Sequence, residues 1–587
     1  MATKLKSVDA LTIGVGWTGG IIAAELTKAG LHVVGLERGE YRNTSPDFQV
    51  PQVHDELSYA VRLKLFQDAG VETVTFRNDA SQTALPLRYL IGFLPGTGLG
   101  GAGVHWNGTT WRFLPWDFET RSKTIARYGA SMLAPECTSQ DWGITYAELE
   151  PFYDRFEYQA GIAGKAGNLK GKIQPGGNPF EGPRSREYPN PPMKTAYQSA
   201  LFRDATAKLG YHPFVMPSAN VTTAYTNPDG ATFGACVYCG YCERFACEMY
   251  AKSSPQLAVL PVALKTGRYD LREGVNVVRI NLDNTRRRAV SVTYVDGAGG
   301  EFEQPAGMIF LTSFILNNVR MLLISGIGTP YDPSTGRGNV GRNYAYQANT
   351  GATYFFEDKT FNPFMGSGAN GMVFDDFNGD NFDHAGAGFI GGADINVNPT
   401  GGRPIQYHPV PPGTPSWGVA WKQAVAKWYS HAFNANAQGG VQSYRANYLD
   451  LDPTYRDAFG LPLLRMTFDW GPYELKQSAY MADVLGKVGK ALGASQTAVR
   501  PLKGHYTTQA YQSTHNTGGA IMGSSPASSV VNKYLQSWDV PNLFVLGASA
   551  FPQNAGYNPT GTVCALAYHT ADAVLKRYVK KPGPLAG

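Results

Sequence analysis

The chain has 587 residues, which is enough for two or more large domains. Hydrophobic residues make up 43% and charged residues 17%, proportions typical of a folded globular protein rather than a disordered one. The formal net charge is only +5 and no basic stretch is interleaved with aromatic residues, which argues against nucleic-acid binding. No apolar run is long enough to cross a bilayer, and we expect no signal peptide because the first core strand begins by about residue 9.

The first forty residues fit the β-α-β pattern of a dinucleotide-binding site. Residues 8–13 are predicted to form a buried strand and residues 32–36 a second one, with a G-x-G-x-x-G turn and a helical pattern between them. The first glycine permits the tight turn, the second lets the backbone approach a pyrophosphate, and the third lets the helix pack close to the sheet. The acidic residue that ends the second strand can bond a ribose hydroxyl. These positions are Gly14, Gly16, Gly19 and Glu37. The pattern alone does not separate FAD from NAD.

A second glycine-rich run covers residues 96–108 and contains His105. So many glycines indicate close approach of the backbone to a ligand. His105 itself is equally consistent with a structural histidine and with a functional one. Residues 163–193 are rich in Gly, Pro, Lys and Asn and are predicted to form a surface excursion.

Four of the six cysteines fall within residues 236–247, with the spacing C-x2-C-x2-C-x4-C. This is close to the ferredoxin run of iron–sulfur proteins, although the last gap is one residue longer and Glu248 stands where proline would follow. A structural zinc site is the rival interpretation, but it usually draws on two separated C-x2-C knuckles. Disulfides are less favoured, because cysteines this close cannot all pair without strain. The predicted ligands are Cys236, Cys239, Cys242 and Cys247.

The C-terminal part carries candidate catalytic groups. His515 stands just ahead of a glycine-rich turn, and residues 542–549 are predicted to be a strand that enters a ligand-facing loop. Asn558 precedes the final helix, where capping that helix is the simplest role for it.

Taken together, these motifs resemble the glucose–methanol–choline (GMC) oxidoreductases, a family of FAD enzymes that oxidise alcohols and sugars. The resemblance rests on the fingerprint at 14–37, GG-x3-H-W at 100–106, H-x2-G-G-x2-M-G at 515–523 and N-P-x2-T at 558–562. With the cysteine run it narrows to the flavoprotein subunits of membrane-bound bacterial sugar and sugar-acid dehydrogenases, among which the gluconate 2-dehydrogenases are nearest. There are two departures from the family pattern. Gly547 stands where many relatives have Asp, and the V-G-R-N run at 340–343 is followed by Tyr344, Ala345, Tyr346 and Gln347, where many relatives have Asp-His.

The resemblance implies roles for particular residues. His105 would attach the flavin covalently, His515 would be the catalytic base and Asn558 the second active-site group. The cluster would be of the [3Fe–4S] type on Cys236, Cys242 and Cys247, which leaves Cys239 as an extra thiol and keeps [4Fe–4S] open. The full expected set of FAD-binding residues is Gly14, Gly16, Gly19, Glu37, Gly100, Gly101, His105, Asn107, Val277, Gly547, Ala548 and Thr560.

The expected fold is α/β: a Rossmann-like FAD-binding domain with a substrate domain built on a mainly antiparallel sheet. The FAD domain is predicted over residues 1–150, 235–345 and 512–587, and the substrate domain with surface excursions over residues 151–234 and 346–511. No decisive substrate motif stands out in residues 345–510.

The resemblance further implies an FAD-dependent dehydrogenase that oxidises a secondary alcohol of a sugar acid, with D-gluconate to 2-keto-D-gluconate favoured. One alternative is a related dehydrogenase that acts on 2-ketogluconate, sorbitol, fructose, glucose or a glycoside. Two further alternatives are an O2-using sugar oxidase with a structural metal site and a non-catalytic flavoprotein. The implied partners are a small subunit with a twin-arginine signal and a multi-haem cytochrome c subunit that passes electrons to quinone. The implied location is the periplasmic face of the bacterial inner membrane.

Overall fold

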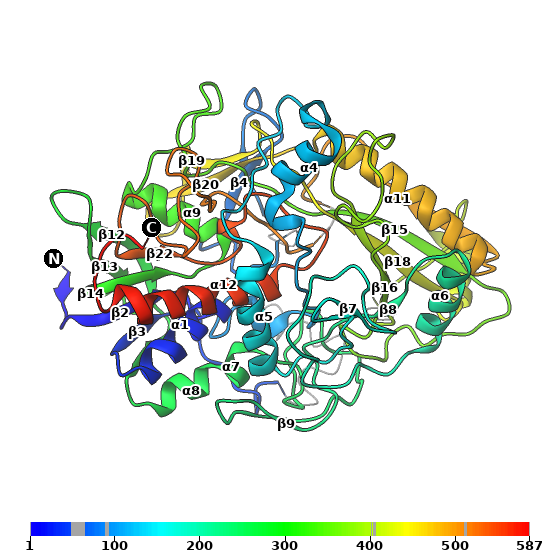
Figure 1. Cartoon of the computed structure of the whole chain (residues 1–587), viewed down its shortest axis with the longest axis horizontal. Coiled ribbons are helices and arrows are strands. Elements are labelled where there is room, and N and C mark those ends of the chain that lie inside the picture. The colour runs from blue at the N-terminus through cyan, green and yellow to red at the C-terminus, as the bar shows by residue number, and fades with distance from the viewer. Residues whose placement is uncertain are drawn as a thin grey trace.

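The computed structural model describes residues 2–48, 65–88, 93–400, 402, 405, 407–509 and 513–585. The predicted domain boundary between residues 511 and 512 lies outside the described residues. Two lobes are visible in Figure 1, one around the strands β2, β3 and β14 and the other around β15 and β18, with the helices α5 and α12 near the middle.

The first lobe is built on an eight-stranded mixed sheet of order β11-β3-β2-β14-β13-β12, with β1 and β22 also paired to β14. The strands β11, β3, β2, β14 and β22 run parallel, whereas β12 and β13 form an antiparallel hairpin against the long strand β14. Apolar residues fill β2, β3 and β22, as expected for parallel strands covered on both faces. The bounds are β1 Thr3–Lys4, β2 Val8–Ile13, β3 Val33–Leu36, β11 Tyr269–Arg272, β12 Asn276–Leu282, β13 Ala289–Val295, β14 Glu301–Leu311 and β22 Leu543–Val545.

Helices cover this sheet and lead into the second lobe. Helix α1 (Trp17–Lys28) is buried around nearly its whole circumference, because it lies between the sheet and the helices α8 (Leu260–Lys265) and α12 (Thr560–Ala573). Helix α12 also packs on α5 (Tyr146–Ala160), which begins with a capping box in which Thr145 and Glu148 bond each other's backbone N–H. On the sheet's other side lies α9 (Ile315–Ser325), which ends at Gly326 with φ of 63°.

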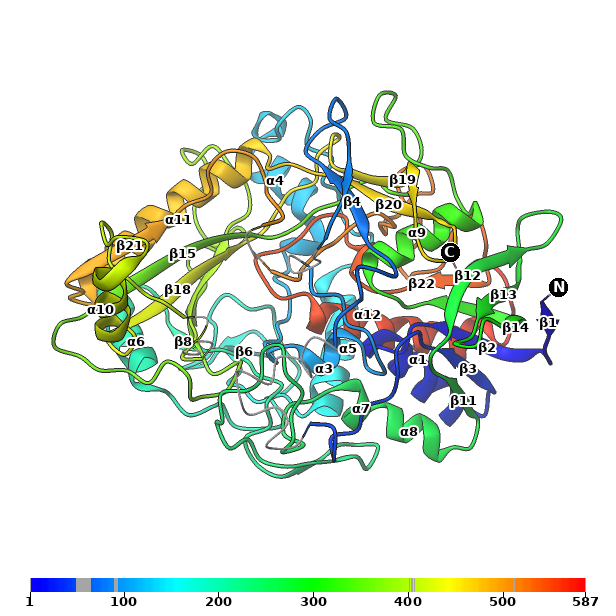
Figure 2. The ribbon, with the colours of Figure 1, turned by 180° about the vertical axis from the view of Figure 1, so that it is seen from behind.

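The second lobe is built on a six-stranded antiparallel sheet of order β21-β15-β18-β17-β16-β8. The long helix α11 (Pro472–Ala491) lies along one face of this sheet, and Figure 2 shows it beside β15 and β21 from behind. The C-terminal half of its buried face is apolar and includes Met481, Leu485 and Val488. The strand bounds are β8 Phe214–Val215, β15 Ala348–Phe355, β16 Met372–Phe374, β17 Ala393–Val397, β18 Ala432–Gly439 and β21 Gln496–Arg500.

A four-stranded sheet of order β19-β20-β4-β5 joins distant parts of the chain. Its central pair is the parallel pairing of β4 with β20, which are separated by almost four hundred residues. The bounds of its strands are β4 Val74–Arg77, β5 Leu85–Pro86, β19 Tyr448–Arg456 and β20 Pro462–Thr467. The remaining elements are two small hairpins, β6 Asn168–Leu169 with β7 Lys172–Ile173 and β9 Tyr225–Thr226 with β10 Thr232–Phe233, and the helices α3 Ala102–His105, α4 Thr120–Tyr128, α6 Tyr197–Lys208, α7 Pro255–Ala258 and α10 Gly418–Trp428.

The segment 163–193 is only partly the surface excursion that its composition predicts. Its residue Arg184 is 1% exposed and forms an ion pair with the buried Glu157 of α5 at 2.6 Å. Arg112 bonds the same carboxylate, so two guanidinium groups and one carboxylate form a buried network between segment and helix. The segment is therefore held against the core by charge pairs, which glycine and proline content cannot reveal.

The predicted α/β fold is confirmed, with one mixed, mainly parallel sheet and one antiparallel sheet. Strands β12 and β13 form a hairpin, and the two cysteines outside the run, Cys137 and Cys564, are buried free thiols. Among the residues that the structure describes, none of the helices combines the length and apolar character needed to span a membrane.

Candidate active site

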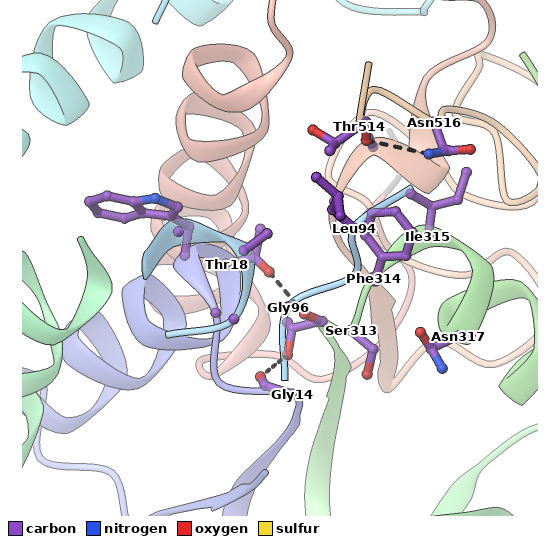
Figure 3. A pocket seen from close by; sticks show the side chains of 18 of the residues that line it. Gly14, Thr18, Leu94, Gly96, Ser313, Phe314, Ile315, Asn317, Thr514 and Asn516 are labelled. Atoms are coloured by element: carbon purple, nitrogen blue, oxygen red, sulfur yellow. Dashed lines mark hydrogen bonds between the residues drawn. The ribbon is translucent and has the colours of Figure 1, made fainter. Parts of the chain in front are cut away.

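A cavity of about 450 Å³ lies at the carboxyl ends of the parallel strands β2, β3 and β14. In a sheet of this kind, ligands bind at the carboxyl ends of the strands, next to the first helix N-terminus. Figure 3 shows that its walls come from four distant parts of the chain: Gly14 and Thr18, Leu94 and Gly96, Ser313 to Asn317, and Thr514 with Asn516. The cavity is thus formed only by the complete fold.

The three fingerprint glycines have different surroundings. Gly14 has φ of +95° and a side chain there would meet Ser313, whereas a Cβ at Gly19 would stand 2.1 Å from the Gly14 carbonyl oxygen. At Gly16 a Cβ would have only the Gly100 carbonyl within 4 Å, at 3.8 Å, because the backbone there faces the cavity. Gly19 therefore serves packing of α1 on the turn, and Gly16 leaves room for a ligand.

Glu37, at the end of β3, holds the turn through its carboxylate. Its two oxygens accept hydrogen bonds from the backbone N–H of Val15, at 2.9 Å, and of Gly39, at 3.1 Å. Burial raises the pKa of Glu37, and these two N–H groups oppose that shift. Because the same carboxylate lines the cavity, its remaining lone pairs can accept a ligand hydroxyl.

His105 ends the short helix α3 and lies in the cavity wall with 4% of its surface exposed. Burial, followed by the positive charge of Lys252, lowers the pKa of His105 to about 3, so its ring is neutral. Its Nε2 atom is buried and has no hydrogen-bond partner among the described residues. A buried polar atom without a partner calls for a ligand, which fits a flavin at this position.

His515 and Asn558, far apart in the chain, meet in the same cavity. The Nε2 atom of His515 stands 3.1 Å from Nδ2 of Asn558, while its Nδ1 atom contacts Oε1 of Gln347. Burial lowers the pKa of His515 to about 3, which keeps the imidazole neutral. This pair is the arrangement expected of a neutral base beside an amide.

Gln347 decides which nitrogen of His515 carries the proton. The Nε2 group of Gln347 donates to the carbonyl oxygens of Ala555, at 3.1 Å, and Tyr557, at 3.2 Å, so its Oε1 must accept. His515 consequently donates from Nδ1 and presents a lone pair at Nε2. The sequence had marked Gln347 only as one of four residues that follow the V-G-R-N run, with no role attached.

The amide of Asn558 is oriented by two further donors. Its Oδ1 accepts from the indole Nε1 of Trp111, at 3.0 Å, and from Nε2 of Gln438, at 3.2 Å, which turns its Nδ2 towards His515. Helix α12 starts after Pro559 and has no side-chain cap hydrogen bond. The simplest role for Asn558, as a helix cap, is therefore wrong.

The second lobe contributes a wall of amides that has no sequence motif. Asn349 of β15 and Asn436 and Gln438 of β18 line the cavity, on adjacent antiparallel strands. Nδ2 of Asn436 donates to Oδ1 of Asn349 at 3.0 Å. Alternation along strands could have suggested inward polar positions, but only the pairing register brings these three residues together.

Most of the predicted cofactor-binding residues line this one cavity. Gly19 does not line it, because it packs α1 against the turn. The four cysteines lie outside its lining as well, although Glu243 and Arg244 of the same segment are part of it. The lining residues from the predicted cofactor set are Gly14, Gly16, Glu37, Gly100, Gly101, His105, Asn107, Val277, Gly547, Ala548 and Thr560.

The cysteine segment forms a tightly curled loop beside the cavity. Tyr238, Gly240 and Arg244 all have positive φ, and backbone hydrogen bonds join the middle of the loop to two other segments. Gly240 donates to the Gly366 carbonyl at 2.8 Å, and Arg244 donates to the His105 carbonyl at 2.7 Å. The last bond attaches the loop directly to the segment that carries His105.

Cys247 lies close enough to the other three thiols to influence their ionisation. Burial raises the pKa of Cys236 to about 11 and of Cys242 to about 12, and Cys247 contributes to the raised pKa of both, and of Cys239. The described residues contain no group of three or more His, Cys, Asp or Glu side chains gathered as a metal site. The donor chemistry suits iron or zinc, and any metal would have to displace the thiol protons.

Two family models, both described as "GMC oxidoreductase", match the chain, one over residues 192–348 and the other over residues 443–567. The chain is 50% identical to the gluconate 2-dehydrogenase flavoprotein of Pantoea cypripedii, over 100% of this chain and 96% of that protein. It is 26% identical to the fructose dehydrogenase large subunit of Gluconobacter japonicus, over 98% of this chain and 99% of that protein. The solved structure of pyridoxine 4-oxidase from Mesorbium loti is similar in fold, with a TM-score of 0.58 and 16% identity, over 96% of this chain and 99% of that one.

Proposed function

The chain belongs to the GMC oxidoreductase family, and on that basis we propose that it is the flavoprotein subunit of a dehydrogenase that oxidises a secondary alcohol of a sugar acid. Family membership makes it an FAD-dependent oxidoreductase that acts on CH–OH donors. In this proposal residues 1–150, 235–345 and 512–587 form the FAD-binding domain, and residues 151–234 and 346–511 the substrate domain.

One observation carries the proposal: a neutral histidine with a fixed lone pair faces the cavity. Nε2 of His515 carries the lone pair, because Gln347 holds the ring proton on Nδ1; an alcohol hydroxyl that takes the place of the Asn558 N–H at this atom can donate its proton there. Asn558 holds the alcohol oxygen through its Nδ2 without adding a competing charge. FAD, when bound, supplies the hydride acceptor for the carbon that carries this hydroxyl.

The residues of the first lobe would hold the flavin. Gly14 and Gly16 bring the backbone to the pyrophosphate and Glu37 bonds the ribose. We assign covalent attachment to His105, since its buried Nε2 has no partner among the described residues. Absorbance of the polypeptide after denaturation and removal of free flavin tests this assignment, and a colourless His105→Ala protein is the expected result.

The cysteine loop would hold an iron–sulfur cluster that carries electrons away one at a time. The spacing of its thiols favours this, and a [3Fe–4S] centre on Cys236, Cys242 and Cys247 is preferred to a [4Fe–4S] centre that also uses Cys239. The hydrogen bond from the Arg244 N–H to the His105 carbonyl supports this role, because it joins the cysteine loop to the segment that would carry the flavin.

D-gluconate is the favoured substrate, with 2-keto-D-gluconate as product. The relative from Pantoea cypripedii, 50% identical, is named for gluconate, and the wall of Asn349, Asn436 and Gln438 offers donors and acceptors to a polyhydroxy chain. A small subunit with a twin-arginine signal and a multi-haem cytochrome c would complete a complex at the periplasmic face of the membrane. Co-purification of both with the native protein is the corresponding test.

The decisive experiment measures turnover of gluconate, 2-ketogluconate, sorbitol, fructose and glucose with an artificial electron acceptor. Gluconate should give the highest kcat/KM, and His515→Ala should lower kcat by about 10²- to 10⁴-fold while its flavin content stays at the parental level. Flavin content that is unchanged together with unchanged turnover would rule out His515 as the base.

An O2-using oxidase is the second candidate. In such an enzyme the metal held by the cysteine loop would be structural, and no electron-carrying cluster would be needed. Anaerobic addition of substrate followed by electron paramagnetic resonance separates the two. A dehydrogenase should show a cluster signal that changes with substrate, whereas the lack of such a signal, together with hydrogen peroxide production once O2 is admitted, would establish the oxidase.

A further inference from the structure

The two residues that orient the catalytic pair both rest on Tyr557. The carbonyl oxygen of Tyr557 accepts a hydrogen bond from Nε2 of Gln347 at 3.2 Å, and Gln347 is the residue that holds the ring proton of His515. The ring of Tyr557 stacks on that of Trp111, with centroids 4.8 Å apart and planes inclined by 19°. The indole of Trp111 in turn donates to Asn558 at 3.0 Å. Tyr557 therefore supports both catalytic groups, one through its backbone and the other through its ring.

Tyr557 itself stands outside the cavity. It is buried, and among the described residues neither Tyr557 nor Trp111 is part of the cavity lining, whereas Asn558 is. A side chain in this position cannot touch a substrate held in the cavity. Any effect of Tyr557 on the reaction must therefore act through the groups that it holds in place.

The hydroxyl group of Tyr557 is anchored in the second lobe. It donates to Oδ2 of Asp375, the residue that follows strand β16. Asp375 is fully buried and also accepts from Nδ2 of Asn178, at 2.5 Å, and from Nδ2 of Asn378, at 3.2 Å. An ionised carboxylate only accepts hydrogen bonds, so it can satisfy all three donors at once. Burial raises the pKa of Asp375 to about 7, and these three hydrogen bonds oppose that shift.

Many buried tyrosines have a bonded hydroxyl for packing alone, and Tyr354 of β15 is one of them. It is fully buried, its hydroxyl donates to the Leu485 carbonyl at 3.0 Å, and its ring contacts Phe433. These partners belong to the apolar core between the second sheet and helix α11. The contacts of Tyr557 differ because they lead to both members of the catalytic pair.

We propose that Tyr557, anchored by Asp375, is the shared positioning residue of the catalytic pair: it fixes the ring of His515 through Gln347 and the amide of Asn558 through Trp111. This inference rests on the proposed roles of His515 and Asn558 in the oxidation of an alcohol. Because Asp375 belongs to the second lobe and Tyr557 directly precedes Asn558, the anchor also ties the geometry of the pair to the contact between the lobes.

The first test compares Tyr557→Phe and Asp375→Asn with the parent in the flavin-loaded protein. Phenylalanine keeps the stacked ring and removes only the hydroxyl group. We expect kcat to fall about 10- to 100-fold in both variants, because small displacements of reacting groups have effects of this size. KM should stay within about twofold of the parental value, since neither side chain binds substrate.

Tyr354→Phe is the matched control, because it removes one buried, bonded hydroxyl group from the core of the second lobe. It should leave kcat unchanged. Flavin per polypeptide and the midpoint of thermal unfolding are measured on every variant, so that a loss of kcat in Tyr557→Phe is compared at equal flavin content and against a control of similar stability.

Double-mutant cycles separate positioning from a general loss of packing. Trp111→Phe removes the donor to Asn558, and Gln347→Leu removes the acceptor of the His515 proton. If Tyr557 acts through these two residues, adding Tyr557→Phe to either variant should lower kcat by a smaller factor than it does in the parent. A purely structural effect would multiply with each of the other two.

Crystal structures of the parent and of Tyr557→Phe test the geometry without turnover. In the parent, Nε2 of His515 lies 3.1 Å from Nδ2 of Asn558, and Nε2 of Gln347 lies 3.2 Å from the Tyr557 carbonyl. At least one of these two contacts should lengthen in the variant. Its lengthening beside a lowered kcat would support the proposal.

Two results would overturn it. One is a Tyr557→Phe protein with the parental kcat and both contacts unchanged, and the other is full additivity in both cycles. A parent that oxidises none of the alcohols tested, or whose turnover survives His515→Ala, would instead refute the proposed function. The crystal structures would still decide the positioning role in that case, since an undisturbed pair in Tyr557→Phe would exclude it.

Discussion

The proton on His515 is fixed by an amide that belongs to a different part of the chain. Gln347 is fully buried and uses both N–H groups on carbonyl oxygens, so its oxygen has one orientation only. A base whose tautomer is fixed in this way is ready before the substrate arrives. The histidine itself could be predicted from the motif at 515–523, whereas its partner is 168 residues away and belongs to no local pattern.

Substitution of Gln347 tests this role. In Gln347→Leu the Nδ1 proton loses its acceptor, and we expect kcat/KM to fall about 10- to 100-fold through population of the wrong tautomer. In Gln347→Glu a carboxylate beside Nδ1 should raise the pKa of His515, so the acidic limb of the kcat/KM profile should move to higher pH. The parent, with a pKa of about 3 for this histidine, should show no such limb near pH 6.5.

Steady-state rates across pH with a flavin-content assay provide the measurement. A leucine variant that keeps full flavin and full kcat/KM would show that another group orients the ring. A glutamate variant with the parental pH profile would show that position 347 does not act on the histidine electrostatically.

Among the elements, the turn between β2 and α1 combines two glycines with opposite tolerances. Gly16→Ala should fold like the parent, because it has φ of −84° and its Cβ would approach only the Gly100 carbonyl. It should nevertheless lose flavin, because the methyl group projects into the cavity. Gly19→Ala should lower the free energy of unfolding by about 1–3 kcal/mol, since its Cβ would collide with the Gly14 carbonyl.

Flavin per polypeptide and thermal unfolding, measured on both variants, distinguish these effects, and each variant is the control for the other. Equal loss of stability in the two would mean that Gly16 also serves packing. Full flavin loading of Gly16→Ala would show that this turn does not contact the flavin.

The predictable elements are those specified by neighbouring residues. The β2-α1-β3 unit follows from alternating apolar segments and glycine spacing within forty residues, and the hairpin of β12 and β13 from two adjacent β-rich runs. The wall of amides could not be predicted from the sequence, because Asn349, Asn436 and Gln438 belong to strands whose pairing is set by the whole sheet.

For the molecule as a whole, buried histidines make stability depend on pH. His569 of α12 stacks on Tyr534 with ring centroids 5.2 Å apart, and burial lowers its pKa to about 4. As pH falls below 6.5 the unfolded chain binds a proton that the native protein does not, so stability present above pH 6.5 is lost on the way to pH 4. His105 and His515 act in the same direction. Buried Asp117, Asp375 and Glu474 oppose it, because burial raises the pKa of each to about 7.

His569→Phe isolates one contribution without touching the cavity. Relative to this variant, the parent should lose about 1–2 kcal/mol of unfolding free energy between pH 7 and about pH 4.5, a figure reduced to allow for partial exposure of the ring. Urea unfolding of both proteins at the two pH values measures the difference. Identical pH dependence in parent and variant would mean that His569 becomes protonated in the native state as readily as in the unfolded chain.

The order in which strands join the sheets has a consequence for how the protein is made. Strand β14 receives its last parallel partner, β22, only once residues Leu543–Val545 exist, and β4 pairs with β20 from residues Pro462–Thr467. On the ribosome, the N-terminal β-α-β unit therefore emerges with neither the sheet edge nor the His515 wall of the cavity present. Pairings this remote in sequence form slowly and late. Flavin capture should accordingly follow completion of the polypeptide, and a chain released before residue 543 should carry no cofactor.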